Sequence, residues 1–374
     1  MSQAFEVGIV GAGIVGLAHA YLAARAGRSV VVFDRDHQAN GASVRNFGFV
    51  TVTGQAAGDT WRRALYSRDV WVEVAEAAGI DICHHGLIML AHSDAAAEVL
   101  ARFAASDMGQ GCTLLDRAAL QQRHAYAHDP ALVAGLQSPH EVRVDSRTAI
   151  PRFAAFLAER YGVVFKRPVA VTGIGRSRVH YAGGETSARY IVVCPGHDYT
   201  SLYPEVFARH PVQQCKLQML RLSPPAWRLN AAVMSDLGLL RYAGYGDAAP
   251  LGALAAHLHS AEADAIARGI HLIVVQNRDG SLIVGDSHVY APTVDDFAEE
   301  ATDDAILALA RRTLDLAGCR VMERWVGVYG KSDQDALIER VDERVAVVAV
   351  TSGTGASTAF GLAADCFKAL KLAV

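Results

Sequence analysis

The chain has 374 residues, more than one typical domain, and its formal net charge is −4. Hydrophobic residues make up 51% and charged residues 20%, as in a globular protein with large cores, and the small charge gives no reason to expect binding to nucleic acid or to an anionic membrane. The six cysteines include no C-x-x-C pair, which argues against a zinc ribbon or a disulfide framework and favours a reducing cytoplasm.

The first predicted elements form a β-α-β unit around a glycine-rich turn. Residues 7–10, 17–25 and 29–33 have the patterns of a strand, a helix and a strand. Between the first two lies GAGIVG (residues 11–16), which fits the dinucleotide pattern G-x-G-x-x-G, and Asp34 follows 18 residues after the last glycine. The N–H groups at such a helix start bind a pyrophosphate, and an acid near this spacing binds ribose hydroxyls. We therefore predict a dinucleotide with a free 2′-hydroxyl, which disfavours NADP.

Residues 7–24 carry no charge and could be mistaken for a signal peptide or a membrane span. No Lys or Arg precedes them, and Glu6 stands where a signal peptide has positive charge. Glycines interrupt the run where a strand–turn–helix needs them. We expect a buried strand and helix, no membrane segment and a cytoplasmic protein.

The middle of the chain, from about 213 to 290, predicts alternating strands: KLQMLRL, GIHLIVVQ and DGSLIVGDSHVY. The sequence N-R-D-G at 277–280 predicts a hairpin between the last two. Residues 295–317 predict an acidic amphipathic helix. The run Cys83-His84-His85 has no partner ligands at metal spacing, so we expect a strand edge there and no metal site.

A second strand–glycine loop–helix lies at the opposite end of the chain. VAVVAV (345–350) predicts a buried strand, TSGTGAST a glycine-rich loop and FGLAADCFKAL a helix. FAD is long enough to need both loops, one for its pyrophosphate and a distant one for the flavin ring. N–H groups at a helix start favour negative charge at the pyrimidine edge of reduced flavin. We therefore predict FAD rather than NAD.

The order and spacing of six motifs resemble one family over essentially the whole chain. The motifs are GIVGAGIVGLAHAYLAARAGRSVVVFDRD, GASVRNFG, VAVTGI, VVCPGHD, WVGVYG and TSGTGAST. They resemble the FAD-dependent amine oxidoreductases that include D-amino-acid oxidase, glycine oxidase and monomeric sarcosine oxidase. The resemblance implies an α/β (α+β two-domain) fold: a Rossmann-type FAD-binding domain of discontinuous chain (1–82, 140–212 and 322–374) and an antiparallel-sheet substrate domain (83–139 and 213–321).

The same resemblance implies how FAD is held. The glycines of the first loop would face the pyrophosphate, Asp34 the adenosine ribose and the backbone of Val169 the adenine. The implied cofactor-binding residues are Gly11, Gly13, Ile14, Val15, Gly16, Asp34, Arg35, Ser43, Arg45, Asn46, Phe47, Val169, Gly196, Gly353, Thr354, Gly355, Ala356, Ser357 and Thr358. We expect noncovalent FAD, because relatives with a covalent link use a cysteine before the terminal glycine loop and that segment has none here.

Candidates for contact with substrate are Arg45, Lys216, Tyr242, Tyr245, His288, Tyr329 and Lys331. Tyr242 and Tyr245 fall where relatives place a substrate tyrosine, but either could equally be a core residue. Lys216 is either an active-site lysine or a solvated strand residue. Arg45 either holds the flavin loop or contacts substrate, and His288 either lines the cleft or packs beside it.

One motif departs from the family. Glycine and D-amino-acid oxidases carry W-x-G-x-R-P, whose arginine clamps the substrate carboxylate, whereas residues 325–330 read W-V-G-V-Y-G and place Tyr329 there. A tyrosine gives one donor and no charge, so we expect ordinary α-amino acids to be poor substrates. The stretches SVRNFGFVTVTGQ, GLLRYAGY, VGDSHVY and RWVGVYG resemble a subgroup commonly encoded beside enzymes of phosphonate breakdown. This resemblance points to an aminophosphonate such as N-methyl-2-aminoethylphosphonate.

The resemblance implies hydride transfer from the carbon beside a neutral amine to flavin, followed by hydrolysis of the imine. Oxygen or another acceptor would reoxidise the flavin. The alternatives are a generic glycine, sarcosine or D-amino-acid oxidase, an NAD-dependent dehydrogenase, and a noncatalytic flavin-binding redox module. The second glycine loop argues against the dehydrogenase, and the large second domain argues against the module. The sequence leaves the oligomeric state open.

Overall fold

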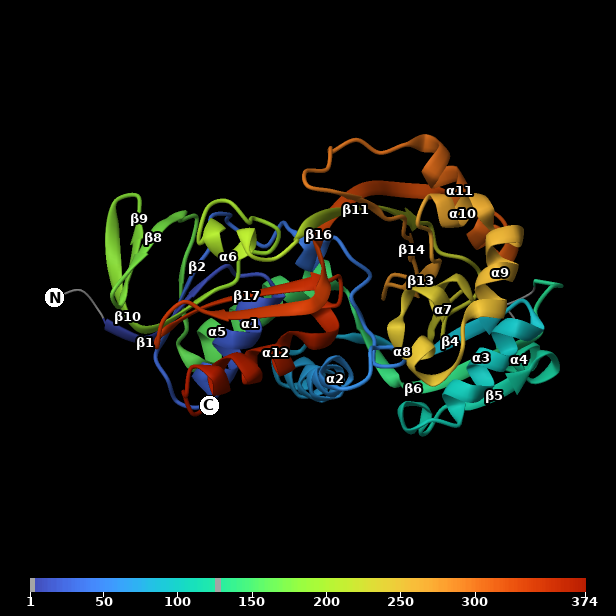
Figure 1. Cartoon of the computed structure of the whole chain (residues 1–374), viewed down its shortest axis with the longest axis horizontal. Helices are drawn as coiled ribbons and strands as arrows, with labels where there is room; N and C mark the ends of the chain where they lie inside the picture. Colours follow the sequence, from blue (N-terminus) through green and yellow to red (C-terminus); the bar gives the residue numbers. More distant parts are fainter. Residues whose placement is uncertain (1–3, 125–128) are drawn as a thin grey trace.

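The computed structural model describes residues 4–124 and 129–374. Five parallel strands form a sheet in the order β17–β10–β1–β2–β7 (Figure 1). They are β1 (Ala4–Val10), β2 (Val30–Phe33), β7 (Val164–Lys166), β10 (Gly184–Val193) and β17 (Val345–Ser352). The hairpin of β8 (Val171–Gly175) and β9 (Arg178–Tyr181) pairs with β10. The strands predicted at 7–10, 29–33 and 345–350 are confirmed.

Side chains of this parallel sheet are buried on both faces, which explains the continuous apolar runs in its strands. On one face, Ile9 and Val348 join the core formed with helices α1 (Ile14–Arg25), α2 (Asp59–Ala78), α5 (Ser146–Tyr161) and α12 (Gly355–Ala369). On the other face, Phe33 and Val347 pack with β9 and α6 (Pro204–Ala208). The sheet is therefore covered from both sides, and the helix predicted at 17–25 is confirmed as part of α1.

A second, mainly antiparallel group of strands occupies the other half of the molecule (Figure 1). Its strands are β3 (Phe49–Val50), β4 (Ile82–Ala91), β5 (Thr113–Asp116), β6 (Ala134–Val144), β11 (Gln213–Leu222), β12 (Ala232–Met234), β13 (Ile273–Gln276), β14 (Leu282–Gly285) and β15 (Val289–Ala291). β12 pairs with β4 in parallel, as an exception. The two groups of strands and their separate cores give the two-domain α/β fold expected from the sequence.

Helices cover this second group of strands. They are α3 (Asp94–Ala104), α4 (Arg117–Arg123), α7 (Leu237–Arg241), α8 (Ala243–Ala248), α9 (Gly252–Ala261), α10 (Ala263–Ala267) and α11 (Glu300–Thr313), with a 3₁₀ turn at Asp107–Gly109. A second 3₁₀ turn, Ala42–Val44, packs against α5 and β16 instead. The hairpin predicted at 277–280 joins β13 and β14, and the acidic helix at 295–317 is present as α11. The four short helices within 237–267 were missed, because the prediction for 213–290 considered strands alone.

One long strand joins the two halves. β16 (Val321–Arg340) pairs with β11 along its first part and with β17 along its last part. The pairing partner of β16 changes from β11 to β17 at Lys331, which stands opposite both Gln213 and Ser352. Side chains near Lys331 therefore lie where the halves meet. The exact domain boundaries stay a prediction. Among the described residues, no helix is both long and apolar enough to cross a bilayer.

Candidate active site

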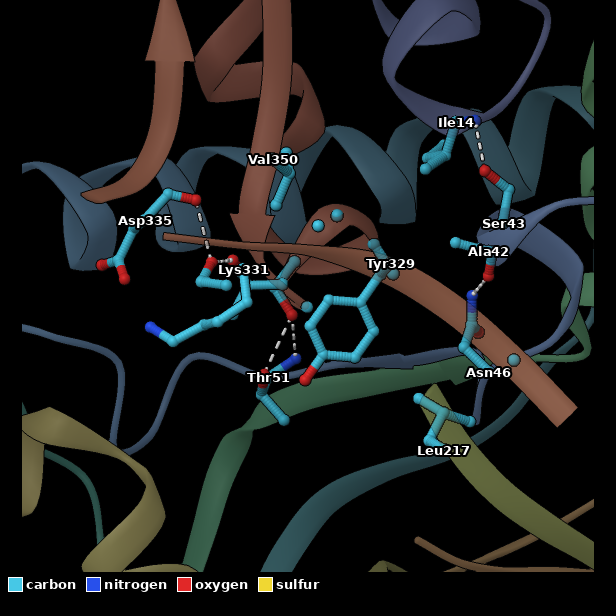
Figure 2. A pocket seen from close by; sticks show the side chains of 18 of the residues that line it. Ile14, Ala42, Ser43, Asn46, Thr51, Leu217, Tyr329, Lys331, Asp335 and Val350 are labelled. Atoms are coloured by element: carbon cyan, nitrogen blue, oxygen red, sulfur yellow. Dashed lines mark hydrogen bonds between the residues drawn. The ribbon is translucent and has the colours of Figure 1, made fainter. Parts of the chain in front are cut away.

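A cavity of about 420 Å³ lies where the two halves meet. The first glycine loop and the start of α1 line it, as do the terminal glycine loop, the start of α12 and a polar cluster from the second half. Figure 2 shows Tyr329 in the middle of this view, with Ile14 and Ser43 on one side and Lys331 and Asp335 on the other. Such a volume is in the range of cofactor and substrate pockets.

The start of α1 is shaped to accept an anion. Gly11 has a positive φ of 100°, and a Cβ on Gly16 would stand 1.8 Å from the Gly11 carbonyl oxygen, so the loop requires glycine at both positions. The Ile14 N–H donates to Ser43 Oγ at 2.9 Å (Figure 2). The N–H groups of Val15 and Gly16 precede the first bond of the helix ladder and line the cavity. They are the donors that a pyrophosphate needs.

The start of α12 offers a second set of donors. The N–H groups of Gly355 and Ala356 precede the first bonds of this helix, which run from Ser357 and Thr358 to the Thr354 carbonyl. Thr51 fixes the neighbouring hydroxyl, because its N–H and its Oγ1 lie 2.8 and 2.9 Å from Ser357 Oγ. The positive end of the α12 dipole therefore faces the cavity.

Most residues assigned to the cofactor line this cavity. They are Gly13, Ile14, Val15, Gly16, Ser43, Arg45, Asn46, Phe47, Gly196, Gly353, Thr354, Gly355, Ala356 and Ser357. Gly11, Asp34, Arg35, Val169 and Thr358 do not line it. The Asp34 carboxylate lies beside the loop, accepting the Ala12 N–H at 2.6 Å and the Asp36 N–H at 2.9 Å. Its contact with a ribose stays a prediction.

Arg45 and Asn46 support the loop that borders the cavity. The Arg45 guanidinium donates to the Val326 carbonyl and to Asn40 Oδ1, each at 3.3 Å. The Asn46 amide donates to the Ala42 carbonyl at 2.6 Å (Figure 2). These contacts favour the first of the two alternatives for Arg45, in which it holds the flavin loop.

The far end of the cavity contains a cation that the sequence analysis did not assign. Arg241, the last residue of α7, lines the cavity, and its Nη2 donates to the Tyr329 hydroxyl at 3.0 Å. Its buried Nε has no hydrogen-bond partner among the described residues. The sequence analysis noted that Tyr329 itself brings no positive charge; Arg241 supplies one beside it. Arg241 lies within the quoted stretch GLLRYAGY, but no local pattern shows that it reaches Tyr329.

Three buried side chains meet at the same end: His271, Asp286 and His288. Asp286 Oδ1 lies 3.4 Å from His271 Nδ1, and Asp286 Oδ2 lies 3.8 Å from His288 Nε2. Burial raises the pKa of Asp286 to about 7, against the effect of Arg241. Burial and then Arg241 lower the pKa of His288 to about 3. The cavity wall thus combines a weakly acidic carboxyl with two neutral imidazoles. The sequence analysis proposed only His288.

Four of the remaining substrate candidates line the cavity and two do not. Tyr242, His288, Tyr329 and Lys331 line it. The Lys216 ammonium instead donates to Asp295 Oδ1 at 2.7 Å and to the Phe297 carbonyl at 3.0 Å. Because side chains alternate along a strand, its neighbour Leu217 faces the cavity and Lys216 faces away. We therefore leave Lys216 out of the site.

Tyr245 also lies outside the cavity lining. It is fully buried, and its ring lies 4.8 Å from that of Phe103. A Cβ on Gly54 would come within 2.5 Å of the ring, so Tyr245 packs directly behind the wall that Gly54 forms. Of the two interpretations of Tyr245, the structure favours the core residue, and we leave it out of the site.

Comparison with known proteins agrees with this geometry. The DAO family model, FAD dependent oxidoreductase, matches residues 6–366. No curated protein sequence matches the chain significantly. Among solved structures, the fold is similar to glycine oxidase from Bacillus cereus ATCC 14579 (15% identity, TM-score 0.79, covering 98% of this chain and 95% of that one).

Two further structures show the same likeness of fold. L-proline dehydrogenase from P. horikoshii has 18% identity and a TM-score of 0.79, over 97% of this chain and 92% of that one. L-α-glycerophosphate oxidase from Mycoplasma pneumoniae, solved with FAD bound, has 15% identity and a TM-score of 0.74, over 99% and 96% of the two chains.

Proposed function

Because the chain belongs to the DAO family of FAD dependent oxidoreductases, we propose that it oxidises a small amine that also carries an anionic group. FAD, when bound, supplies the chemistry by accepting a hydride from the carbon beside the amine nitrogen. The imine product then hydrolyses in water to a carbonyl compound and an amine. The chain's own residues have three tasks: to hold the cofactor, to hold the anionic group and to orient the amine.

The residues present fit FAD. All four of Val15, Gly16, Gly355 and Ala356 line the cavity; with FAD bound, the first two N–H groups would bind the pyrophosphate and the last two the flavin's pyrimidine edge. Preorganised donors at that edge stabilise the negative charge that reduction creates. The two helix starts belong to opposite ends of the chain, as a long cofactor requires.

The observation that carries the proposed substrate class is the contact between Arg241 and Tyr329. A half-buried guanidinium on the cavity wall, held by a tyrosine hydroxyl and with a buried Nε that has no partner among the described residues, can bind an anion. The Nε that lacks a hydrogen-bond partner can donate to a ligand. An anionic group on the substrate can accept from it, and the guanidinium fork can hold two of its oxygens.

Within this class we favour an aminophosphonate such as N-methyl-2-aminoethylphosphonate. A tetrahedral phosphonate has three oxygens that need donors from different directions and carries more negative charge than a carboxylate. Arg241, Tyr329, Lys331 and Tyr242 line the cavity and can supply such donors. Since a guanidinium also binds a planar carboxylate well, an oxidase of glycine, sarcosine or D-amino acids is the second candidate, and Arg241 is the observation that favours it.

The test is an anaerobic substrate panel scored by bleaching of the flavin absorbance. The panel contains 2-aminoethylphosphonate, its N-methyl derivative, glycine, sarcosine, D-alanine and L-proline. We expect the aminophosphonates to bleach the flavin fastest, and admission of air to show whether oxygen reoxidises it. If sarcosine or D-alanine is faster than both aminophosphonates, the second candidate is correct. If no amine bleaches the flavin, a noncatalytic flavin-binding module is favoured.

A further inference from the structure

The group formed by His271, Asp286 and His288 has no task in holding the cofactor or the anionic group. All three side chains line the cavity and all are at most 8% exposed. They come from one antiparallel pair, with His271 just before β13 and the other two just after β14. Asp286 Oδ1 and His271 Nδ1 have no hydrogen-bond partner among the described residues. These two atoms lie 3.4 Å from each other on the cavity wall, where a polar group of a ligand can reach them.

The hydrogen bonds of His288 determine which of its nitrogens can accept a proton. Its Nδ1 lies 2.8 Å from the Gly269 carbonyl oxygen. A carbonyl only accepts, so Nδ1 carries the proton and, in the neutral ring, Nε2 is an acceptor. Nε2 faces Asp286 Oδ2 across 3.8 Å. Because this nitrogen is an acceptor, it favours the protonated form of the Asp286 carboxyl.

The charges on the cavity wall indicate how a substrate that carries both an anionic group and an ammonium would be oriented. Arg241 acts electrostatically on Asp286 and on both imidazoles. Its positive charge disfavours a metal cation among the three side chains and attracts the substrate's anionic group instead. Asp286, the buried carboxylate of this cluster, is then the group that can face the substrate's ammonium.

We propose that Asp286 binds the substrate ammonium and accepts one proton from it, an inference that rests on the proposed function. One N–H bond of the ammonium breaks and one O–H bond forms on the carboxylate, so the amine becomes neutral and the carboxyl becomes uncharged. The neutral amine has the free electron pair that hydride loss from its neighbouring carbon requires. His271, 3.4 Å from Oδ1, stays neutral beside the carboxyl, and Asp286 releases its proton to water after the product has left.

Because Asp286 accepts a proton from the substrate in this proposal, the rate of flavin reduction should follow the ionisation of Asp286. Asp286 faces Arg241 and Tyr242 from the α7–α8 segment, Tyr290 from β15 and Cys215 from β11, besides the two histidines. The pKa of Asp286, raised to about 7, means that it is protonated and cannot accept below that pH, and is ionised and can accept above it. The second-order rate constant of reduction should therefore rise through about pH 7 and then level off, well below the pKa of the free amine.

The experiment compares the wild-type holoenzyme with Asp286→Asn, which keeps the side-chain volume. Flavin reduction by N-methyl-2-aminoethylphosphonate and by sarcosine is followed anaerobically from pH 6 to 10. An alkylammonium has a pKa of about 10, so only about 1% is neutral at pH 8. We expect the Asn variant to be about 100-fold slower at pH 8, with a profile that rises toward pH 10, where the two proteins converge. Superimposable profiles would overturn the inference while leaving the proposed function intact.

Controls separate this role from other causes. Asp279→Asn changes a carboxylate on the exposed β13–β14 turn and should keep the wild-type profile. If Asp286→Asn does not retain flavin, His271→Gln should shift the midpoint of the wild-type profile by at least about half a pH unit, and an unchanged midpoint would overturn the inference. Loss of activity after dialysis against EDTA, restored by a divalent metal, would also overturn it. If neither amine reduces the wild-type flavin, the proposed function fails and this inference with it.

Discussion

Arg241 and Tyr329 are 88 residues apart in the chain, yet Nη2 of the arginine lies 3.0 Å from the tyrosine hydroxyl on the wall of the cavity. The arginine ends a short helix of the second half, and the tyrosine stands on the strand that joins the halves. The W-x-G-x-R-P motif of the resemblance has an arginine in the sequence position that Tyr329 occupies here. Here the positive charge comes from a helix and the strand supplies the hydroxyl that orients it.

Replacement of Arg241 should weaken substrate capture. Arg241→Ala removes a charged partner from the cavity wall, which costs about 3 kcal/mol, or on the order of 100-fold in kcat/KM. Arg241→Lys keeps the charge but loses the planar fork and should recover part of the rate. Tyr329→Phe removes one hydrogen bond and should cost about tenfold. Flavin content measured by absorbance should be unchanged in all three. Normal kcat/KM in the Ala variant would remove Arg241 from the anion site.

Asp34 should contribute to FAD affinity. Asp34→Asn keeps an oxygen that can accept the Ala12 N–H but removes the charge that strengthens bonds to the ribose. We expect FAD to bind about 10- to 100-fold more weakly, as the loss of one charge-assisted hydrogen bond implies. Titration of the apoprotein with FAD measures this change. Asp36→Asn, at the neighbouring exposed position, is the matched control, and equal affinities in the two variants would contradict the role of Asp34.

Gly353 should tolerate no side chain. Its φ is +76°, and a Cβ there would lie 2.9 Å from the Tyr329 ring. Gly353→Ala should therefore displace Tyr329 or the terminal loop, and reduce both flavin content and the rate of flavin reduction. Gly252→Ala, at the start of α9, meets nothing within 4 Å and should leave both unchanged. A Gly353→Ala enzyme with wild-type spectrum and rate would contradict the close packing of this loop.

Acid precipitation should release all the flavin into the supernatant. Cys194 is the cysteine that lines the cavity among the described residues, and its carbonyl oxygen lies beside Gly11 in the first glycine loop. Burial raises the pKa of its thiol well above the usual range, so the reactive thiolate is scarce. Yellow colour that stays in the pellet would show a covalent link.

The sequence predicts best what depends on neighbouring residues. The two glycine loops and the strands and helices beside them follow from local patterns, so most of the positions assigned to the cofactor could be placed on the cavity wall from the sequence. Arg241, His271 and Asp286 could not, because their partners lie far away in the chain and no spacing marks them. The position of Lys216 outside the cavity lining could not be predicted for a related reason. A shift of the strand-pairing register by one residue turns every side chain of the strand to the opposite face, and the sequence does not determine this register for β11.

Stopped-flow flavin reduction with a matched pair of amines tests the central claim most directly. N-methyl-2-aminoethylphosphonate carries the anionic group, and N-methylpropylamine has a similar chain without it. If Arg241 and Tyr329 hold the anionic group, the phosphonate should reduce the wild-type flavin at least about 100-fold faster at pH 8, and Arg241→Ala should remove most of that advantage. Equal second-order rate constants for the two amines in the wild-type enzyme would contradict the account.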